Sequence, residues 1–278
     1  MSTAEQLLRD AVARLKEAGV DTPVLDAEVL LSRAACRSRT DLLTHPEYQP
    51  SSQAAAQFQE WVARRTNREP LAYIIGEREF YGISFQVTPA VLIPRQETET
   101  LVDAAIELLK DRTHSLVADI GLGSGAVAVS IARSLSNATV YGTESSKAAL
   151  EVAKLNAVGR YAYFLKGDLL EPLAGLTFDL IVSNPPYIPT AEIDNLAPEI
   201  SKYEPRQALD GGPDGLDYHR RLRSESPAYL KCGGTLAVEV GMGQAEAVKK
   251  LFTESRFVDV RSVRDLMDIE RVVLGDKP

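Results

Sequence analysis

The segment Asn184-Pro185-Pro186-Tyr187 combines residue types that can hold a planar amino group. The Asn184 side-chain oxygen and the Pro185 carbonyl oxygen are two hydrogen-bond acceptors, and the adjacent prolines keep their spacing nearly rigid. Tyr187 adds a flat face on which a planar π-system can stack. We therefore predict a site for the –NH₂ group of a carboxamide or of a nucleic-acid base. In this site Asn184, Pro185 and Tyr187 are catalytic, and Pro186 completes the substrate-binding set.

A planar amino group is a poor nucleophile because its lone pair is delocalised. Two acceptors that take both of its hydrogens return electron density to the nitrogen and stabilise the positive charge that develops during attack. Rigid acceptors also aim the lone pair at an electrophile. A sulfonium methyl is an electrophile that needs neither a metal nor a covalent enzyme intermediate. The sequence agrees with this chemistry, because it shows no metal-ligand spacing and no Ser/His/Asp set.

A glycine-rich turn stands upstream of this segment. In "VADIGLGSGAVAVSIA", Gly121, Gly123 and Gly125 separate an apolar strand from a helical pattern. Glycines allow a ligand to approach the backbone, and the N–H groups at the helix start then face it. Glu144 ends the next predicted strand, where a carboxylate can accept hydrogen bonds from both hydroxyls of a ribose. The pattern predicts a nucleotide-type ligand, with a nicotinamide cofactor and S-adenosylmethionine as alternatives.

The elements that position these residues follow from the alternation of apolar strands and helices after residue 115. The predicted strands cover residues 115–119, 138–143, 162–166, 178–183, 235–241, 257–263 and 269–275. The predicted helices lie near residues 127–135, 147–156, 222–231 and 244–251. Such alternation indicates a largely parallel sheet covered on both faces. Ligands of such sheets bind beyond the carboxyl ends of the strands, where both turns are expected.

The first part of the chain has a different periodicity. Helical spacing of apolar residues over residues 1–75, with a capping-box pattern at Thr3 and Gln6, predicts a small helical bundle. Residues 76–95 alternate around a glycine and predict a β-hairpin linker. An amphipathic helix follows, so residues 96–278 are predicted to form the catalytic domain.

Composition narrows the class of protein. The 278 residues carry a net charge of −8, which argues against a protein that grips long stretches of phosphate backbone. No signal peptide and no membrane span are evident, so a cytoplasmic location is expected. Cys36 and Cys232 match no zinc or redox motif and are predicted to be buried free thiols. The three histidines are scattered, so no metal site is predicted.

Longer segments of the chain resemble the release-factor glutamine methyltransferases, which methylate a glutamine side-chain amide in class 1 peptide-chain release factors. The segments that carry the resemblance are "EPLAYIIGEREFYG", "VLIPRQETE", "DIGLGSGAVAVSIA", "FDLIVSNPPYIP", "YEPRQALDGGPDGLD" and "EVGMGQAE". They span essentially the whole chain. The resemblance implies a class I S-adenosylmethionine-dependent methyltransferase fold, which is a Rossmann-like seven-stranded mixed sheet, behind a helical bundle that recognises the substrate.

The resemblance also implies a role for each matching position. The turn Gly121-Leu122-Gly123-Ser124-Gly125 is expected to contact the methionine part of S-adenosylmethionine, and Glu144 its ribose. Asp168 and Leu169 are expected to border the adenine. Asn184 is expected to contact both the cofactor and the substrate glutamine, which residues 184–187 hold.

Three positions depart from the family pattern. Glu144 replaces a usual aspartate, Leu169 stands where an aromatic residue often stacks, and Gln96 stands where a proline-type residue is common. Arg95, Glu97 and Glu99 either position ligands or serve as charges at a helix start. The segment "YEPRQALDGGPDGLD" either shapes the pocket rim or is only a turn-rich loop.

Three alternative functions make different demands on the chain. A nucleic-acid amino-methyltransferase shares the tetrad, but the charge and the lack of a separate base-reading domain disfavour it, and direct nucleic-acid binding is not expected. A non-catalytic cofactor-binding protein would not need Asn184. A nicotinamide oxidoreductase would need a proton donor set near the glycine turn, and none is evident.

Overall fold

Two units make up the chain in this computed structural model, which describes residues 2–157 and 162–278. The first unit contains residues 1–76 and the separate segment 197–203. The second contains residues 77–196 and 204–278. Among the described residues, no helix is both long and apolar enough to cross a membrane.

The first unit is built from helices around its own apolar core. Its elements are α1 (Ala4–Glu17), α2 (Pro23–Ala35), α3 (Arg39–Thr44), α4 (Ser52–Thr66), α5 (Leu71–Ile75) and α9 (Pro198–Ser201). The predicted capping box is present, because the Thr3 hydroxyl accepts from the Gln6 backbone N–H while the Gln6 side chain accepts from Thr3. Leu15, Leu30 and Phe58 are fully buried, so α1, α2 and α4 enclose the core of this unit.

The segment 197–203 joins the first unit through charged side chains. Arg65 Nε donates to Asp26 at 2.7 Å, and its Nη1 donates to Glu199 in α9 at 2.9 Å. Arg68 donates to both carboxylate oxygens of Glu199 at 2.6 and 2.7 Å. Burial acts to raise the pKa of Glu199, but the hydrogen bonds from Arg68 and Arg65 outweigh it and hold that pKa at about 2. This segment follows the tetrad in sequence, and sequence patterns did not predict its place among the helices.

Acid is expected to weaken the first unit through Glu199. Its folded pKa of about 2 lies below the ordinary value of 4.5, so the folded form releases the proton more readily than the unfolded chain does. The stability that Glu199 contributes is therefore fully present above about pH 4.5 and is lost as the pH falls toward 2. Urea unfolding across this pH range measures the loss. Glu199→Gln should unfold with a weaker dependence on pH, and an unaltered dependence would show that Glu199 contributes nothing to it.

The second unit contains a seven-stranded mixed sheet and a separate two-stranded hairpin. The hairpin strands are β1 (Glu77–Phe80) and β2 (Ile83–Gln86). The sheet strands are β3 (Ser115–Ile120), β4 (Ala138–Glu144), β5 (Ala162–Lys166), β6 (Phe178–Ser183), β7 (Leu230–Glu239), β8 (Val258–Arg264) and β9 (Glu270–Asp276). Their order is β5-β4-β3-β6-β7-β9-β8, with β9 antiparallel to both of its neighbours. The predicted fold class is confirmed.

The order of the strands determines where a ligand can bind. Successive strands run outward from β3 to β4 and β5, and the chain then returns to place β6 on the other side of β3. The crossover leaves a crevice between the loops after β3 and β6, beyond the carboxyl ends of these parallel strands. The glycine turn follows β3 and Asn184 follows β6, so the topology brings both predicted motifs to this switch point.

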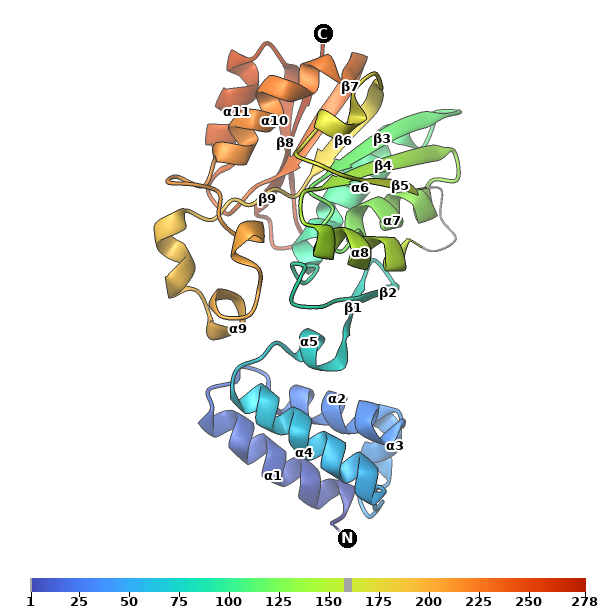
Figure 1. The fold of residues 1–278 in the computed structure, drawn as a ribbon, viewed down its shortest axis with the longest axis vertical. Helices are drawn as coiled ribbons and strands as arrows, with labels where there is room; N and C mark the ends of the chain where they lie inside the picture. Colours follow the sequence, from blue (N-terminus) through green and yellow to red (C-terminus); the bar gives the residue numbers. More distant parts are fainter. Residues whose placement is uncertain (1, 158–161) are drawn as a thin grey trace. The chain divides into compact units, whose positions relative to one another are not determined.

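Helices cover both faces of the sheet (Figure 1). On one face lie α6 (Glu99–Leu109), α7 (Ala126–Ser134) and α8 (Lys147–Asn156), and on the other α10 (Asp217–Glu225) and α11 (Ala245–Glu254). Alternate residues of one strand therefore enter different cores: Leu180 packs with the first set and Ile181 with the second. Two-sided burial explains why the strands read as continuous apolar runs. The hairpin adds Phe80 and Phe85 to the first core.

Two details differ from the sequence predictions. The helix predicted over residues 222–231 is instead α10, which ends at Glu225 because Pro227 cannot continue the backbone hydrogen bonding, and Leu230 already pairs with β6. Cys36 and Cys232 were predicted to be buried, but both are exposed. Cys36 is the C-cap residue of α2, and Cys232 is the third residue of β7, in the exposed part of that strand.

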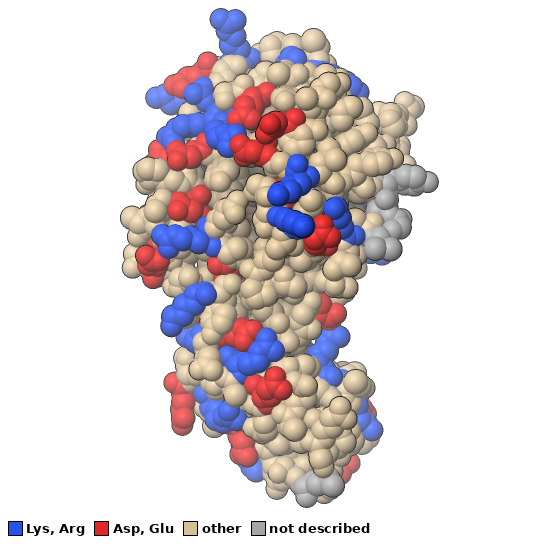
Figure 2. Space-filling model, viewed as in Figure 1, with Lys and Arg blue, Asp and Glu red and all other residues tan. Residues whose placement is uncertain are grey.

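Charges of both signs are mixed on the face of the molecule that Figure 2 shows. Exposed arginines there and elsewhere pair with acids, as Arg220 does with Asp214 and Asp217. Among the described residues drawn on this face, Lys and Arg do not gather into one broad patch.

Candidate active site

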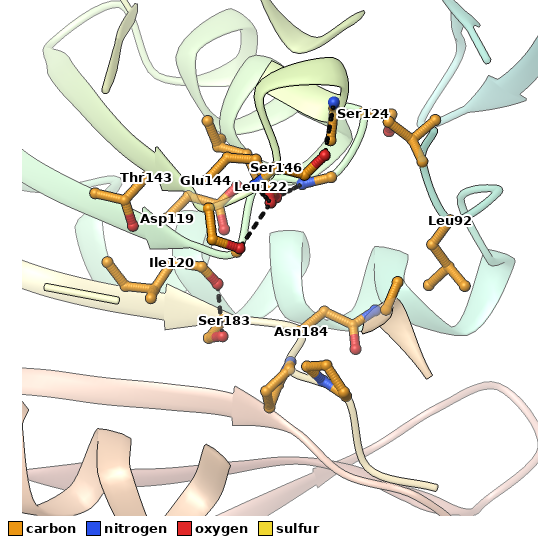
Figure 3. Close-up of a pocket in the computed structure, with 18 of the residues that line it drawn as sticks. Leu92, Asp119, Ile120, Leu122, Ser124, Thr143, Glu144, Ser146, Ser183 and Asn184 are labelled. Atoms are coloured by element: carbon orange, nitrogen blue, oxygen red, sulfur yellow. Dashed lines mark hydrogen bonds between the residues drawn. The ribbon is translucent and has the colours of Figure 1, made fainter. Parts of the chain in front are cut away.

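A pocket of about 320 Å³ opens in the second unit at the switch point of the sheet. This volume falls within the range of small-molecule sites. Its lining includes the predicted site residues Gly121, Leu122, Gly123, Ser124, Glu144, Asp168, Leu169, Asn184, Pro185 and Pro186. Gly125 and Tyr187 are not among the lining residues. Figure 3 shows Glu144 and Asn184, from the ends of β4 and β6, as parts of this one cavity.

The glycine turn has the open backbone expected of a ligand cradle. Gly121 and Gly123 have φ values of +79° and +53°, and a Cβ added at either would meet no protein atom within 4 Å. Both positions therefore offer backbone without a side chain to a neighbour in the pocket. Gly125 is the N-cap of α7 in the left-handed conformation, and it turns the chain into the helix.

Glu144 ties the end of β4 to the glycine turn. Its Oε2 accepts from the Gly123 backbone N–H at 2.9 Å, and its Oε1 accepts from the Ser146 N–H at 2.8 Å. The Ser145 hydroxyl also donates to Oε1, at 3.5 Å. A carboxylate has about four lone-pair positions, so these three bonds leave some acceptor capacity. The sequence predicts Glu144 as a hydrogen-bond acceptor for a ligand. In the structure this side chain also binds the backbone of the glycine turn.

Asp168 and Leu169 line the pocket at the loop after β5. Arg221 donates to both oxygens of Asp168 at 3.2 and 2.7 Å. Leu169 has a φ of +41°, an uncommon conformation for a leucine, and its carbonyl accepts from the Thr143 hydroxyl at 2.6 Å. Backbone in sparsely populated regions clusters at ligand sites, and Leu169 presents an apolar side chain there.

Asp119 is a pocket residue that sequence analysis missed. It is the fifth residue of β3, is 2% exposed and accepts from the Ala128 N–H at 3.0 Å through Oδ2. Burial raises the pKa of Asp119 to about 7, the hydrogen bond from Ala128 opposes that rise, and the charge of Glu144 adds to it. An acid two residues before the first glycine of the turn is the signal that would have identified it.

Two charged residues of "VLIPRQETE" make different kinds of contact. Arg95 lines the pocket and pairs with the buried carboxylate of Glu204, which also accepts from the Ile93 N–H at 3.4 Å. Glu99 accepts from the Tyr81 N–H at 2.8 Å and so joins α6 to the hairpin. Arg95 therefore remains a candidate for ligand contact, whereas Glu99 has a structural bond away from the pocket.

The tetrad begins where β6 ends, and its side chains diverge. The Ser183 hydroxyl donates to the Ile120 carbonyl at 2.7 Å, which links the ends of β6 and β3. Asn184 lines the pocket and donates through Nδ2 to the Thr98 hydroxyl oxygen at 3.1 Å. The Tyr187 hydroxyl is directed to Glu239 at 3.4 Å. Burial, together with the Glu239 charge, raises the pKa of Tyr187, so its phenol is neutral.

Two of the segments that carry the family resemblance contact the backbone of the tetrad. In "EVGMGQAE", the Gln244 side chain accepts from the Gly241 N–H and donates to the Tyr187 carbonyl, both at 2.9 Å. In "DGGPDGLD", the absence of a Cβ at Gly211 and Gly215 allows close approach to the tetrad. A Cβ at Gly215 would lie 2.3 Å from the Tyr187 carbonyl oxygen. These segments thus contact the carbonyls of Pro186 and Tyr187, the last two residues of the tetrad.

Gly215→Ala is expected to destabilise the second unit by about 1–3 kcal/mol, because the added methyl overlaps the Tyr187 carbonyl and the backbone has a left-handed φ of +76°. Urea unfolding measures the change. Gly82→Ala is the matched control, since Gly82 has a φ of +67° but no atom within 4 Å of an added Cβ. Equal losses of unfolding free energy in the two variants would show that close packing at Gly215 contributes nothing to stability.

Comparison with known proteins places the chain in a family. The model of the PrmC N-terminal domain matches residues 6–76, and that of the methyltransferase small domain matches residues 98–213. The release factor glutamine methyltransferase of Geobacter sulfurreducens is 46% identical over 94% of this chain and 92% of that protein. Its counterpart in Caulobacter vibrioides is 42% identical over 95% and 93%, respectively.

A solved structure supports the fold independently of close sequence similarity. A methyltransferase from Pyrococcus furiosus superimposes with a TM-score of 0.51 at 19% identity, over 70% of this chain and 89% of that one. The fold and the position of the pocket agree with the methyltransferase names of the two relatives. Both relatives match nearly the whole chain. The chain belongs to the release factor glutamine methyltransferase family.

Proposed function

We propose that this protein transfers a methyl group from S-adenosylmethionine to the side-chain amide nitrogen of a glutamine in the Gly-Gly-Gln loop of class 1 peptide-chain release factors, in the cytoplasm. The observation that carries the proposal is that Asn184 and Pro185 line the same pocket as the glycine turn and Glu144. One cavity thus contains acceptors for an amide and a cradle for a nucleoside.

The residues of the cradle fit S-adenosylmethionine. The Gly121 and Gly123 positions leave open space beside the backbone for the methionine part, and the remaining acceptor capacity of Glu144 suits the ribose hydroxyls. Leu169 and Asp168 border the space for the adenine, with aliphatic contact from Leu169. When bound there, S-adenosylmethionine supplies an electrophilic sulfonium methyl group.

Asn184 and Pro185 act on the other reactant. Their oxygens accept both hydrogens of the glutamine amide, return electron density to its nitrogen and stabilise the charge that develops on it. The nitrogen forms a bond to the methyl carbon as the carbon–sulfur bond breaks, and the electron pair of that bond stays on sulfur. The methylated nitrogen then gives one proton to water. Because the protonated amide is strongly acidic, this last step needs no dedicated base.

We assign substrate recognition to the helical first unit. The match of residues 6–76 to the N-terminal domain model supports this assignment. The nearly neutral charge of residues 1–76 suits a protein partner better than a nucleic acid.

Glu144→Ala is expected to weaken S-adenosylmethionine binding by about 10-fold or more, because a charged acceptor for the ribose is lost and the Gly123 N–H loses its partner. Calorimetric titration measures the dissociation constant. Glu144→Asp is the control and should stay within a few fold, since it keeps the carboxylate. An unchanged dissociation constant for the alanine variant would remove Glu144 from the cofactor site.

The proposed reaction is tested by incubation with methyl-labelled S-adenosylmethionine and purified class 1 release factor, beside parallel reactions with tRNA, rRNA and DNA. We expect label on the release factor alone, and mass spectrometry of its peptides should place the methyl on the glutamine of the Gly-Gly-Gln loop. A release factor in which that glutamine is replaced by glutamate is the matched control and should take up no label. Label on a nucleic acid instead would reject the proposal in favour of an amino-methyltransferase of bases.

A further inference from the structure

A buried set of polar side chains lies behind the tetrad. Thr98 is 4% exposed and Glu239 is 1% exposed. Asn184 Nδ2 donates to Thr98 Oγ1 at 3.1 Å, and the Thr98 hydroxyl in turn hydrogen-bonds the Glu239 carboxylate. The chain of contacts therefore runs from the pocket, through one hydroxyl, to a carboxyl group at the end of β7.

Apart from Thr98, few hydrogen-bond donors lie near the carboxyl group of Glu239. Its Oε1 is 3.4 Å from the Tyr187 hydroxyl, and among the described residues its Oε2 has no hydrogen-bond partner. Burial raises the pKa of Glu239 to about 7, while the Thr98 hydroxyl and the Arg271 charge oppose the rise. The neighbouring His219 uses Nε2 on the Glu239 backbone carbonyl at 2.9 Å. The Thr98 and Tyr187 hydroxyls are therefore the two hydrogen-bond donors that the described residues offer to the side chain of Glu239.

The chemistry of a single hydroxyl makes this arrangement directional. A threonine hydroxyl has one hydrogen to donate and two lone pairs to accept with. At pH 8, above the Glu239 pKa of about 7, this carboxyl group is mostly ionised and only accepts. The Thr98 hydrogen then points to Glu239, and its lone pairs are left for Asn184. Asn184 must then present its Nδ2 to Thr98. The opposite end of the amide, Oδ1, is the end that remains for a ligand in the pocket.

We propose that Thr98 and Glu239 are positioning residues that set the direction of the Asn184 carboxamide, so that its oxygen rather than its nitrogen meets the substrate amide. This inference rests on the proposed function for the identity of the substrate. If the Thr98 hydrogen were free, it could donate to Oδ1 and stabilise a flipped Asn184. A flipped amide would offer donors to the substrate –NH₂ group and would oppose its binding.

The first experiment compares Thr98→Val with Thr98→Ser. Valine keeps the volume but removes the hydroxyl, so we expect methyl transfer to release factor to fall about 10-fold in kcat, while serine restores most of it. The S-adenosylmethionine dissociation constant should stay unchanged in both. Thr235→Val is the matched control, because Thr235 is also buried and donates to a carboxylate, Asp276, at 2.7 Å. It should keep the activity of the unmutated enzyme.

A second measurement in these variants reports the direction of the amide. Release factor carrying glutamate in place of the target glutamine offers acceptors where the glutamine offers donors. The unmutated enzyme should therefore bind the glutamine form more tightly than the glutamate form. In Thr98→Val this preference should shrink several fold, because Asn184 can turn its nitrogen outward. A purely structural loss would weaken both forms equally, and that result would overturn the inference.

A third experiment does not depend on the substrate. Asn184→Asp places a carboxylate oxygen against a hydroxyl whose hydrogen is committed to Glu239. At pH 8 we expect this change to lower Tm by at least about 2 °C more in the Thr98 background than in the Thr98→Val background. If Thr98 were free to donate, the introduced carboxylate would accept that hydrogen. Asn184→Asp would then lower Tm less in the Thr98 background than in the Thr98→Val background, and this result would overturn the inference. Absence of any methyl transfer by the unmutated enzyme, with the expected Tm cycle, would instead reject the proposed function and leave the directed amide standing.

Discussion

Asn184→Ala should lower the rate of methyl transfer by about 10²-fold or more while the dissociation constant of S-adenosylmethionine stays nearly unchanged. The magnitude follows from the loss of one preorganised group that stabilises charge in the transition state. Asn184 lines the pocket and its amide donates to Thr98, so in the proposed function it would meet the substrate already oriented. Single-turnover kinetics with release factor measure the rate, and calorimetry measures cofactor binding.

Asn137→Ala is the matched control for this substitution. Asn137 is also partly buried and donates through Nδ2 to a backbone carbonyl, that of Arg112, but it does not line the pocket. Its removal should leave methyl transfer unchanged. Weaker cofactor binding with normal turnover in Asn184→Ala would contradict the assigned role, because Asn184 would then serve the cofactor and not the amide.

Arg65→Leu should destabilise the first unit by about 3–5 kcal/mol. The Arg65 and Asp26 side chains are 7% and 4% exposed, and Arg65 also donates to Glu199. Removing the cation leaves Asp26 as a buried charge without its partner. The resulting loss of stability is much larger than the net stability that the intact ion pair contributes. Hydrogen exchange in α2 and α4 and chemical unfolding measure the loss.

Arg64→Leu is the control for Arg65→Leu. Arg64 pairs with Glu69 but its side chain is 36% exposed, so its removal should cost less than about 1 kcal/mol. Equal effects of the two substitutions would show that burial does not set the energy of the Asp26–Arg65 pair.

Local patterns in the sequence were sufficient for the fold class and the two motifs. Strand and helix periods depend on neighbouring residues, so most strands from residue 115 onward could be predicted to within two residues of their ends. The exception is β7, which begins at Leu230 and not at residue 235. The glycine turn and the tetrad each contain, within a few residues, the backbone freedom or rigidity that their chemistry requires. A parallel sheet then brings both to the same edge, because a strand's carboxyl end is defined by chain direction alone.

Only the tertiary structure decided which distant side chains meet. Thr98 and Glu239 carry no local signal for the roles proposed for them, since those roles depend on the residues that they contact across the fold. The place of Glu199 among the helices of the first unit likewise depends on Arg65, far away in sequence. Hydrogen bonds in a buried site form between groups that packing brings together, and sequence spacing does not encode those pairings. The sequence by itself therefore determined the fold class and the residues proposed as acceptors and cradle, whereas the fold determined which buried side chains contact them.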